Sequence, residues 1–314
     1  MAESRNIETK HAQPGQPDAH TLPARLFWVL AGMTLGWGVS WPVMKIVLGE
    51  LEPLRFRALT MISGLALLAM SAWQGRALRV PRGQWPRLVW VSLFNITGWG
   101  MFAMYGLRLM PSGRAVIVAY TMPVWAVLFG SLFAGEAITR RRALGVALGM
   151  VGMVLLLSGE FHALQSAPLG AFYLILAAVC WAIATVMLRH WPVALSGTAL
   201  TGWQIVIGNA PIWIGTLLLE HGPWFPNSGQ AWLALGFNLC ITSVFCLWAF
   251  TRIATEAPVA VSSLSTLMIP AIGVLSGMLM LGERPQWHDL AALAFVFAAL
   301  ATVLLPARPF GRRV

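Results

Sequence analysis

Charged residues are scarce in this chain. Asp, Glu, Lys and Arg make up 10% of its 314 residues, whereas soluble domains carry about a quarter charged residues. Hydrophobic residues make up 58%. Because so few charges cannot cover a water-exposed surface, the composition excludes an ordinary soluble domain. Long apolar runs between polar breaks instead predict an all-α membrane protein that crosses the bilayer many times.

Cysteine is also scarce. The chain has three cysteines, Cys180, Cys240 and Cys246, and all of them lie inside apolar runs. An odd count does not give a complete disulfide framework, and the spacing matches no metal-ligand motif. We therefore expect these cysteines to be packing residues, and we expect no metal site and no cofactor.

Catalytic and energy-coupling motifs are missing as well. The histidines lie in or near predicted loops without a nucleophile–base pattern or paired carboxylates, so we do not expect an enzyme. No Gly-Lys pair occurs, which excludes a Walker A loop. No Asp or Glu lies at the centre of a predicted span, where proton-coupled carriers usually place an ionisable relay. Facilitated diffusion or exchange is therefore favoured.

The apolar runs predict ten membrane-spanning helices, because about 20 apolar residues at roughly 1.5 Å each cross the hydrocarbon core. The predicted helices cover 26–48, 54–73, 87–107, 114–134, 141–158, 169–189, 196–219, 231–251, 258–281 and 287–305. They form a first five-helix repeat at 26–158 and a second at 169–306, joined by a linker at 159–168. A disordered cytoplasmic tail at 1–25 and a basic cytoplasmic tail at 307–314 are expected to flank the repeats.

The formal net charge is +10, but the arginines gather in short loops. No basic helix or aromatic RNA-binding motif accompanies them, so nucleic acid is not an expected partner. With the N-terminus inside, most Arg and Lys residues fall in cytoplasmic segments, as the positive-inside rule requires. The prediction is a multi-pass protein of a bacterial-type inner (plasma) membrane with both termini cytoplasmic.

One apolar segment occurs twice in the chain, in two similar copies. YTMPVWAVLFGSLFAGE at 120–136 aligns without a gap with LMIPAIGVLSGMLMLGE at 267–283, and both copies keep a proline, two glycines and a Gly-Glu ending. Phe94-Asn95 likewise matches Phe237-Asn238. An odd number of helices in each half forces two similar halves into opposite orientations. Inverted repeats of this kind are a transporter design, with the substrate site between the halves near the midplane.

These features resemble the drug/metabolite transporter superfamily in its EamA-type two-repeat form. The Trp37-Gly38 opening of the first span and the paired Gly135-Glu136 and Gly282-Glu283 endings carry the resemblance, which covers residues 26–306. The architecture is also similar to that of the YddG-like aromatic amino-acid exporters, although no motif private to that branch is present. The resemblance implies export of metabolites or amino acids. We expect both glutamates to anchor loops rather than to contact substrate.

Four residues of the repeated segment, Pro123, Gly130, Pro270 and Gly277, are predicted to act as hinge or packing residues. Proline lacks an amide hydrogen and crowds the preceding turn, so each helix is expected to break in mid-membrane. The glycines allow close helix approach. A static packing kink explains the same pattern. Small residues four apart in the fifth span favour close packing within the chain, with a homodimer seam as the alternative.

The chain has 16 tryptophans, more than two interfacial belts require. Indole combines a large apolar face with one donor, which suits a cavity for aromatic or amphipathic solutes, although core packing or lipid contact is the alternative for each ring. Lys45 is the candidate to attract a substrate carboxylate, with snorkelling to the headgroups as its alternative. The predicted substrate-binding residues are Trp37, Ser40, Trp41, Lys45, Asn95, Trp99, Tyr120, Trp125, Trp181, Thr185, Asn238, Trp248, Ser262 and Ser265.

The sequence therefore predicts an inner-membrane transporter that exports or exchanges small amphipathic metabolites by alternating access. Amino acids, including aromatic ones, are the favoured class, because their side chains would stack on indole. A multidrug exporter of cationic or lipophilic compounds is the first alternative, and a channel-like pore is the alternative from another class. The expected partners are a small-molecule substrate and the lipid bilayer.

Overall fold

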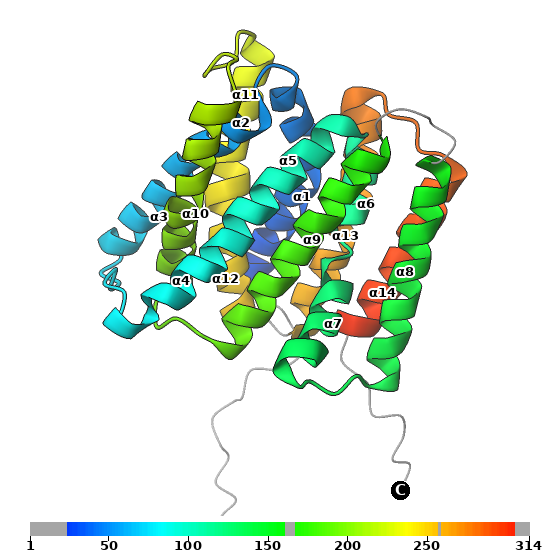
Figure 1. Ribbon diagram of the computed structural model, residues 1–314, viewed down its shortest axis with the longest axis horizontal. Coiled ribbons are helices and arrows are strands. Elements are labelled where there is room, and N and C mark those ends of the chain that lie inside the picture. The colour runs from blue at the N-terminus through cyan, green and yellow to red at the C-terminus, as the bar shows by residue number, and fades with distance from the viewer. Residues whose placement is uncertain (1–23, 161–166, 257–258, 305–314) are drawn as a thin grey trace, which may run out of the picture.

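The structure is a computed structural model that describes residues 24–160, 167–256 and 259–304, and these residues form helices without a strand. The predicted tails and linker fall largely outside the described residues. Two faces of the molecule serve as reference. At the lower face in Figure 1, α1 (Ala24–Leu48) begins and α7 (Met122–Ala134) ends, whereas at the upper face α1 ends and α2 (Pro53–Leu59) begins.

The remaining helices follow in chain order. Those of the first half are α3 (Met61–Trp73), η1 (Arg82–Gln84), α4 (Trp85–Ser92), η2 (Leu93–Gly98), α5 (Trp99–Leu109), α6 (Ser112–Ala119) and α8 (Arg140–Glu160). Those of the second half are α9 (Ala167–His190), α10 (Gly197–Leu219), α11 (Gly229–Phe237), η3 (Asn238–Phe245), α12 (Cys246–Glu256), α13 (Val259–Leu281) and α14 (Trp287–Leu304). The segment η1 is a 3-10 helix, and η2 and η3 are π-helical.

Helices of spanning length dominate the described residues. Seven stretches are long and apolar enough to cross a membrane: Arg25–Leu48, Pro53–Trp73, Arg82–Leu109, Ser112–Ala134, Pro168–His190, Gly197–Leu219 and Gly229–Phe250. Two shorter apolar helices are Met268–Leu281 and Trp287–Thr302, and α8 lies over the predicted fifth span. The all-α, multi-span fold is confirmed, whereas the count of ten spans stays a prediction.

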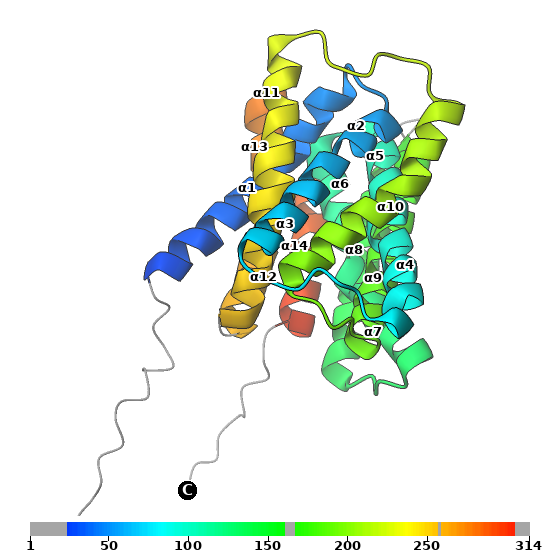
Figure 2. The same ribbon diagram turned by 90° about the vertical axis from the view of Figure 1, so that its left-hand side faces the viewer.

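The two halves contact each other reciprocally. The first helix of one half, α1, packs against α11, α12 and α13, and the first helix of the other half, α9, packs against η2, α5, α6 and α7. In the same way α10 packs along α2 and α3, and α8 packs along α14 (Figures 1 and 2). Figure 1 also shows α9 running from the upper to the lower face, opposite to α1. The halves are therefore arranged as inverted repeats.

The two copies of the repeated segment differ at mid-depth. In the first copy Tyr120 and Thr121 separate α6 from α7, and Pro123 stands in the first turn of α7, where an amide hydrogen is not needed. In the second copy α13 continues through Pro270. The sequence predicts a break at both prolines, but only the first is broken. The hydroxyl of Thr121 donates to a carbonyl one turn earlier at 2.7 Å, whereas the aligned residue Met268 has no side-chain donor.

Other spans are irregular at the same depth. Thr60 separates α2 from α3 in the second span. The third span of each half contains a π-helical segment, η2 with Asn95 and η3 beginning at Asn238, where the sequence repeats Phe-Asn. Inserted π-helical turns are frequent at functional sites. These irregular segments place backbone and polar side chains at the interface between the halves.

The Gly-Glu endings form the same turn twice. Gly135 and Gly282 adopt a left-handed backbone with φ of 65° and 67°, a conformation that glycine enters without strain. The amide of the following glutamate then donates back to its own helix, to the carbonyl of Gly130 at 3.1 Å in the first copy and of Gly277 at 3.3 Å in the second. Each glutamate carboxylate consequently lies beside the glycine of its own helix.

Candidate substrate cavity

A cavity of about 840 Å³ lies between the two halves. Its walls come from α1, α2, η2, α5, α7 and the start of α8 in the first half and from α9, α10, η3, α12 and α13 in the second. Arg189, whose side chain is 65% exposed, lines the cavity at the lower face. Toward the upper face the lining side chains of Met44 and Met104 are buried. The cavity is therefore accessible from the lower face.

Tryptophan side chains form one wall of the cavity. The ring centroids of Trp41 and Trp99 lie 6.4 Å apart at an interplanar angle of 87°, and those of Trp99 and Trp181 lie 5.1 Å apart at 63°. Trp37 also lines the cavity, 5.5 Å from the ring of Phe250. Edge-to-face aromatic pairs stabilise one another. The tryptophan wall is thus preorganised to stack on a flat apolar solute.

Polar groups face the same cavity. Nδ2 of Asn95 donates to Oε1 of Gln204 at 2.6 Å and joins η2 to α10 across the halves. Ser40 and Thr185 donate their hydroxyls to carbonyls of their own helices at 2.6 and 2.8 Å, so their oxygens remain able to accept. Oγ1 of Thr242 in η3 is buried and has no partner among the described residues. The cavity therefore combines an aromatic wall with groups that can hydrogen-bond a solute.

The cavity brings together more than half of the residues that the sequence predicts for substrate binding. The predicted residues that line it are Trp37, Ser40, Trp41, Asn95, Trp99, Tyr120, Trp181 and Thr185. The predicted hinge residue Pro123 lines it too. Their role in binding stays a prediction, and the structure gives these residues a common location.

Other predicted residues have their contacts elsewhere. Trp125 stacks on a neighbouring phenylalanine with ring centroids 6.4 Å apart. Asn238 is buried and donates to a carbonyl one turn earlier at 2.9 Å. The guanidinium of Arg252 lies 5.5 Å from the ring centroid of Trp248. None of these three predicted residues lines the cavity described here. Two further predicted residues lie on α13 at positions whose side chains are outside the described structure: Ser262 and Ser265.

Lys45 does not line the cavity. Its ammonium donates to the carbonyls of Leu107, Arg108 and Met110 at 2.6, 3.2 and 2.6 Å. These carbonyls lie at the end of α5, where the helix dipole favours a cation. The structure thus gives Lys45 a helix-capping role, and its predicted contact with a substrate carboxylate stays a prediction. The sequence did not indicate this role because the acceptors are backbone atoms far away in the chain.

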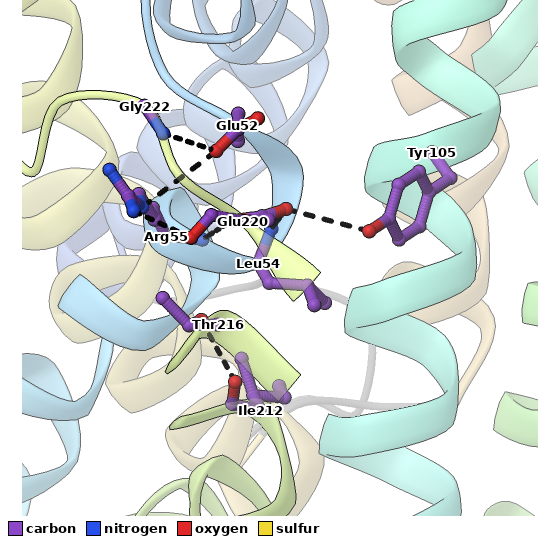
Figure 3. A network of polar contacts seen from close by, with 8 residues as sticks. All are labelled: Glu52, Leu54, Arg55, Tyr105, Ile212, Thr216, Glu220 and Gly222. Atoms are coloured by element: carbon purple, nitrogen blue, oxygen red, sulfur yellow. Dashed lines mark hydrogen bonds and ion pairs between the residues drawn. The ribbon is translucent and has the colours of Figure 1, made fainter. Parts of the chain in front are cut away.

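The upper face is held closed by carboxylates that cross from one half to the other. Glu220, at the end of α10, accepts the backbone amides of Leu54 and Arg55 at 2.8 Å each (Figure 3). Nη2 of Arg55 donates in return to the carbonyl of Glu220 at 2.8 Å, and the amide of Gly222 donates to Glu52 at 3.0 Å. The second half thereby caps the first turn of α2.

A second cap closes the same face. The carboxylate of Glu283 accepts the amides of Ser112 at 2.6 Å and Gly113 at 2.9 Å, the first residues of α6. Nε of Arg114 lies 2.8 Å from Oδ1 of the buried Asp289, which is another contact between the halves. The second Gly-Glu ending therefore caps a helix of the opposite half.

The first Gly-Glu ending has basic partners at the lower face. Oε1 of Glu136 lies 3.3 Å from Nη1 of Arg189 and 3.2 Å from Nε2 of His190, and Oε2 lies 3.1 Å from Nη1 of Arg142. The hydrogen bond with His190 and the charges of the two arginines lower the pKa of Glu136 from its ordinary value of 4.5. Glu136 and both arginines line the cavity. The open end of the cavity is thus charged.

The sequence prediction missed Arg57, a charged residue that lines the cavity away from this charged end. An arginine inside a membrane span is by itself a signal for a functional site. Its position soon after Pro53, at the start of the span, made it resemble an interfacial residue. Thr60 and Gln204 also line the cavity and were not among the predicted site residues.

Inverted helical halves that enclose a central cavity open to one face are typical of membrane transporters. The family model of the EamA-like transporters matches residues 25–158 and 168–305. The chain therefore belongs to the EamA-like transporter family, with two EamA repeats, and its function is transport rather than catalysis.

Relatives agree with this assignment. The chain is 27% identical to the uncharacterized transporter YvbV of Bacillus subtilis (strain 168) over 283 residues, 88% of this chain and 90% of that protein. It is 24% identical to the uncharacterized inner membrane transporter YedA of Escherichia coli (strain K12) over 292 residues, 90% of this chain and 94% of that protein. A crystal structure with 22% identity matches 93% of this chain and 99% of its own with a TM-score of 0.65, which supports the fold.

Proposed function

We propose that this protein exports or exchanges small amphipathic metabolites by alternating access, with amino acids, including aromatic ones, as the favoured class. The observation that supports this most is the cavity between the inverted halves, with its tryptophan wall and its amides and hydroxyls. Its volume of about 840 Å³ falls within the roughly 300–1,000 Å³ of small-molecule sites. An aromatic side chain would stack on the wall while the polar end of the solute meets the hydrogen-bonding groups.

In this proposal the lower face is cytoplasmic. The arginine-rich start of α8, with Arg140, Arg141 and Arg142, lies at that face, and positive residues favour the cytoplasmic side. Solute then enters from the cytoplasm while the contacts of Glu220 and Glu283 close the outer side. Release requires those contacts to open and the lower face to close.

Flux in this proposal follows the gradient of the solute. Among the described residues that line the cavity, Glu136 is the sole carboxylate, and it lies at the lower face with basic partners. A proton relay at mid-depth would need an ionisable group that changes charge during the cycle. Exchange of internal for external solute fits this lining better than coupling to protons.

Purified protein in liposomes tests the proposal. Vesicles loaded with unlabelled tryptophan should take up labelled tryptophan transiently by counterflow, at rates that saturate with concentration, and protein-free vesicles serve as the control. A channel-like pore would show neither saturation nor counterflow. Movement of cationic dyes without saturable flux of any amino acid would refute the proposed class and support the multidrug alternative.

A further inference from the structure

We propose that Arg57 binds the carboxylate of the substrate, so that the cavity selects aromatic and apolar carboxylates over organic cations. The inference rests on the transport function proposed above and narrows its substrate class. It makes Arg57 a specificity-determining residue of the central cavity.

Arg57 is a cation without a counter-charge. Its side chain lines the cavity, and its Nε is buried with no hydrogen-bond partner among the described residues. No carboxylate in the described part of the chain forms an ion pair with it. Arg55, on the same short helix, instead donates to the carbonyl of Glu220 at 2.8 Å and lies 5.0 Å from the ring centroid of Trp224. One arginine of α2 closes the upper face, and the other is left for a ligand.

A guanidinium in this position is suited to a carboxylate. Removing a charged group from water is unfavourable unless a partner of opposite charge compensates for it. The planar guanidinium presents parallel donors that match both oxygens of a carboxylate. A bound anion therefore relieves the unpaired charge of Arg57, whereas a bound cation adds repulsion.

The neighbouring helix leaves room for this side chain. Gly100 on α5 faces Arg57, and a Cβ added at Gly100 would lie 2.6 Å from Nε. A larger residue would push the guanidinium aside, so the wall is shaped around it. Gly100 directly follows Trp99, whose ring belongs to the tryptophan wall. Arg57 and the tryptophan wall line the same cavity, and this combination fits a carboxylate attached to an aromatic or apolar body.

The other charges of the cavity favour the same sign of solute. Arg142 and Arg189 lie at the lower face, and Glu136 already pairs with both of them. A cationic solute would find no unpaired carboxylate among the described lining residues. An anionic solute would pass a basic entrance and find Arg57 inside.

Binding of three indole compounds to the purified protein tests the inference. Indole-3-propionate has the carboxylate without an ammonium, tryptamine has the ammonium without a carboxylate, and tryptophanamide carries a neutral amide in place of the carboxylate. We expect the wild-type protein to bind indole-3-propionate at least about tenfold more tightly than tryptamine, the scale of a hydrogen bond to a charged group. Arg57→Gln should weaken binding of indole-3-propionate at least about tenfold and leave binding of tryptophanamide unchanged. Arg57→Lys, which keeps the charge, should recover part of the loss.

Arg79→Gln is the matched control, because Arg79 is exposed in the loop between α3 and α4; it should bind all three compounds as the wild type does. Equal losses for the carboxylate and the amide in Arg57→Gln would show a structural role and overturn the proposal. Normal binding of indole-3-propionate by that variant would overturn it too. If Arg57→Gln does not fold, the affinities of the wild-type protein for indole-3-propionate and tryptamine decide. Tighter binding of tryptamine would overturn the proposal. In each case, saturable tryptophan counterflow by the wild-type protein would still support the proposed function. Absence of counterflow would refute both the proposed function and the proposed role of Arg57.

Discussion

Replacing Glu283 by glutamine should shift the protein from the conformation of this structure, in which the cavity opens to the lower face (lower-open), toward one in which it opens to the upper face (upper-open). In the structure the two carboxylate oxygens accept the first amides of α6 at 2.6 and 2.9 Å. Glutamine keeps one acceptor oxygen but loses the second acceptor and the charge. Loss of a capping acceptor costs about 0.5–2 kcal/mol, and loss of an anion at a helix N-terminus costs about 0.3–1 kcal/mol.

The substitution should therefore destabilise conformations in which the upper face is closed by about 1–3 kcal/mol, because this contact joins the two halves there. At about 1.4 kcal/mol for each factor of ten, the ratio of upper-open to lower-open protein should rise about 5- to 150-fold. The population of the minor, upper-open conformation is the quantity to measure. While this conformation is the minor one, its population rises by the same factor as the ratio.

Thiol accessibility measures the shift. Ala103 lines the cavity and is buried, so Ala103→Cys, in a background without the native cysteines, reports access to the cavity interior. The labelling rate by an impermeant thiol reagent added at the upper face should rise in Glu283→Gln and should not rise in Arg79→Gln. An unchanged or slower rate in a folded Glu283→Gln protein would show that this contact does not hold the upper face closed.

Four further outcomes follow from the same contacts. Glu136→Gln should change labelling from the upper face in the opposite direction to Glu283→Gln, and a change in the same direction in both would contradict the symmetry of the halves. Gly277→Ala should behave like Glu283→Gln because the added Cβ would lie 2.6 Å from the Glu283 carboxylate, whereas Gly130→Ala, with 3.3 Å to the Glu136 carboxyl carbon, should be mild in the same labelling assay. Lys45→Met should lower the free energy of unfolding by about 1–3 kcal/mol, because carbonyls at the end of α5 lose a charged donor; thermal unfolding in detergent measures this, and unchanged stability would contradict the capping role. An imposed pH gradient between about pH 6 and 8 should not drive uptake. The pKa of Glu136 is lowered from its ordinary value, so this carboxylate stays ionised over that whole pH range and carries no proton. Accumulation of solute against its gradient in proteoliposomes would refute this expectation.

Patterns that repeat along the chain predicted the fold well. The spans, the inverted halves and the matched Phe-Asn pairs depend on local hydropathy and on counting, and Asn95 and Asn238 indeed occupy π-helical segments of equivalent spans. The tryptophan wall followed from an excess of indole at depth. These inferences need only local hydropathy and the comparison of segments along the chain, which is why they could be made from the sequence.

Polar partners that lie far apart in the chain could not be predicted in this way. Lys45 and Glu283 bind backbone groups of helices far away in the chain, and no residue type marks a backbone acceptor or donor. Arg57 was missed for the opposite reason, because what distinguishes it is the lack of a partner and the space that Gly100 leaves for it. Such features appear only when the packing of the helices is known.

The two Gly-Glu endings make the same turn but meet different partners, and the inverted symmetry explains the difference. Glu283 caps the first turn of α6, at Ser112 and Gly113. When the ungapped alignment of 120–136 with 267–283 is extended toward the N-terminus, these positions correspond to 259–260, the first turn of α13. A conformation with the halves exchanged would therefore present Glu136 to the start of α13, once it has released the basic side chains that now hold it. Since both caps cannot form while one face is open, each copy would supply the closing contact of one face in this inferred cycle, and this would account for a glycine that turns the helix end and a carboxylate that follows it in both halves.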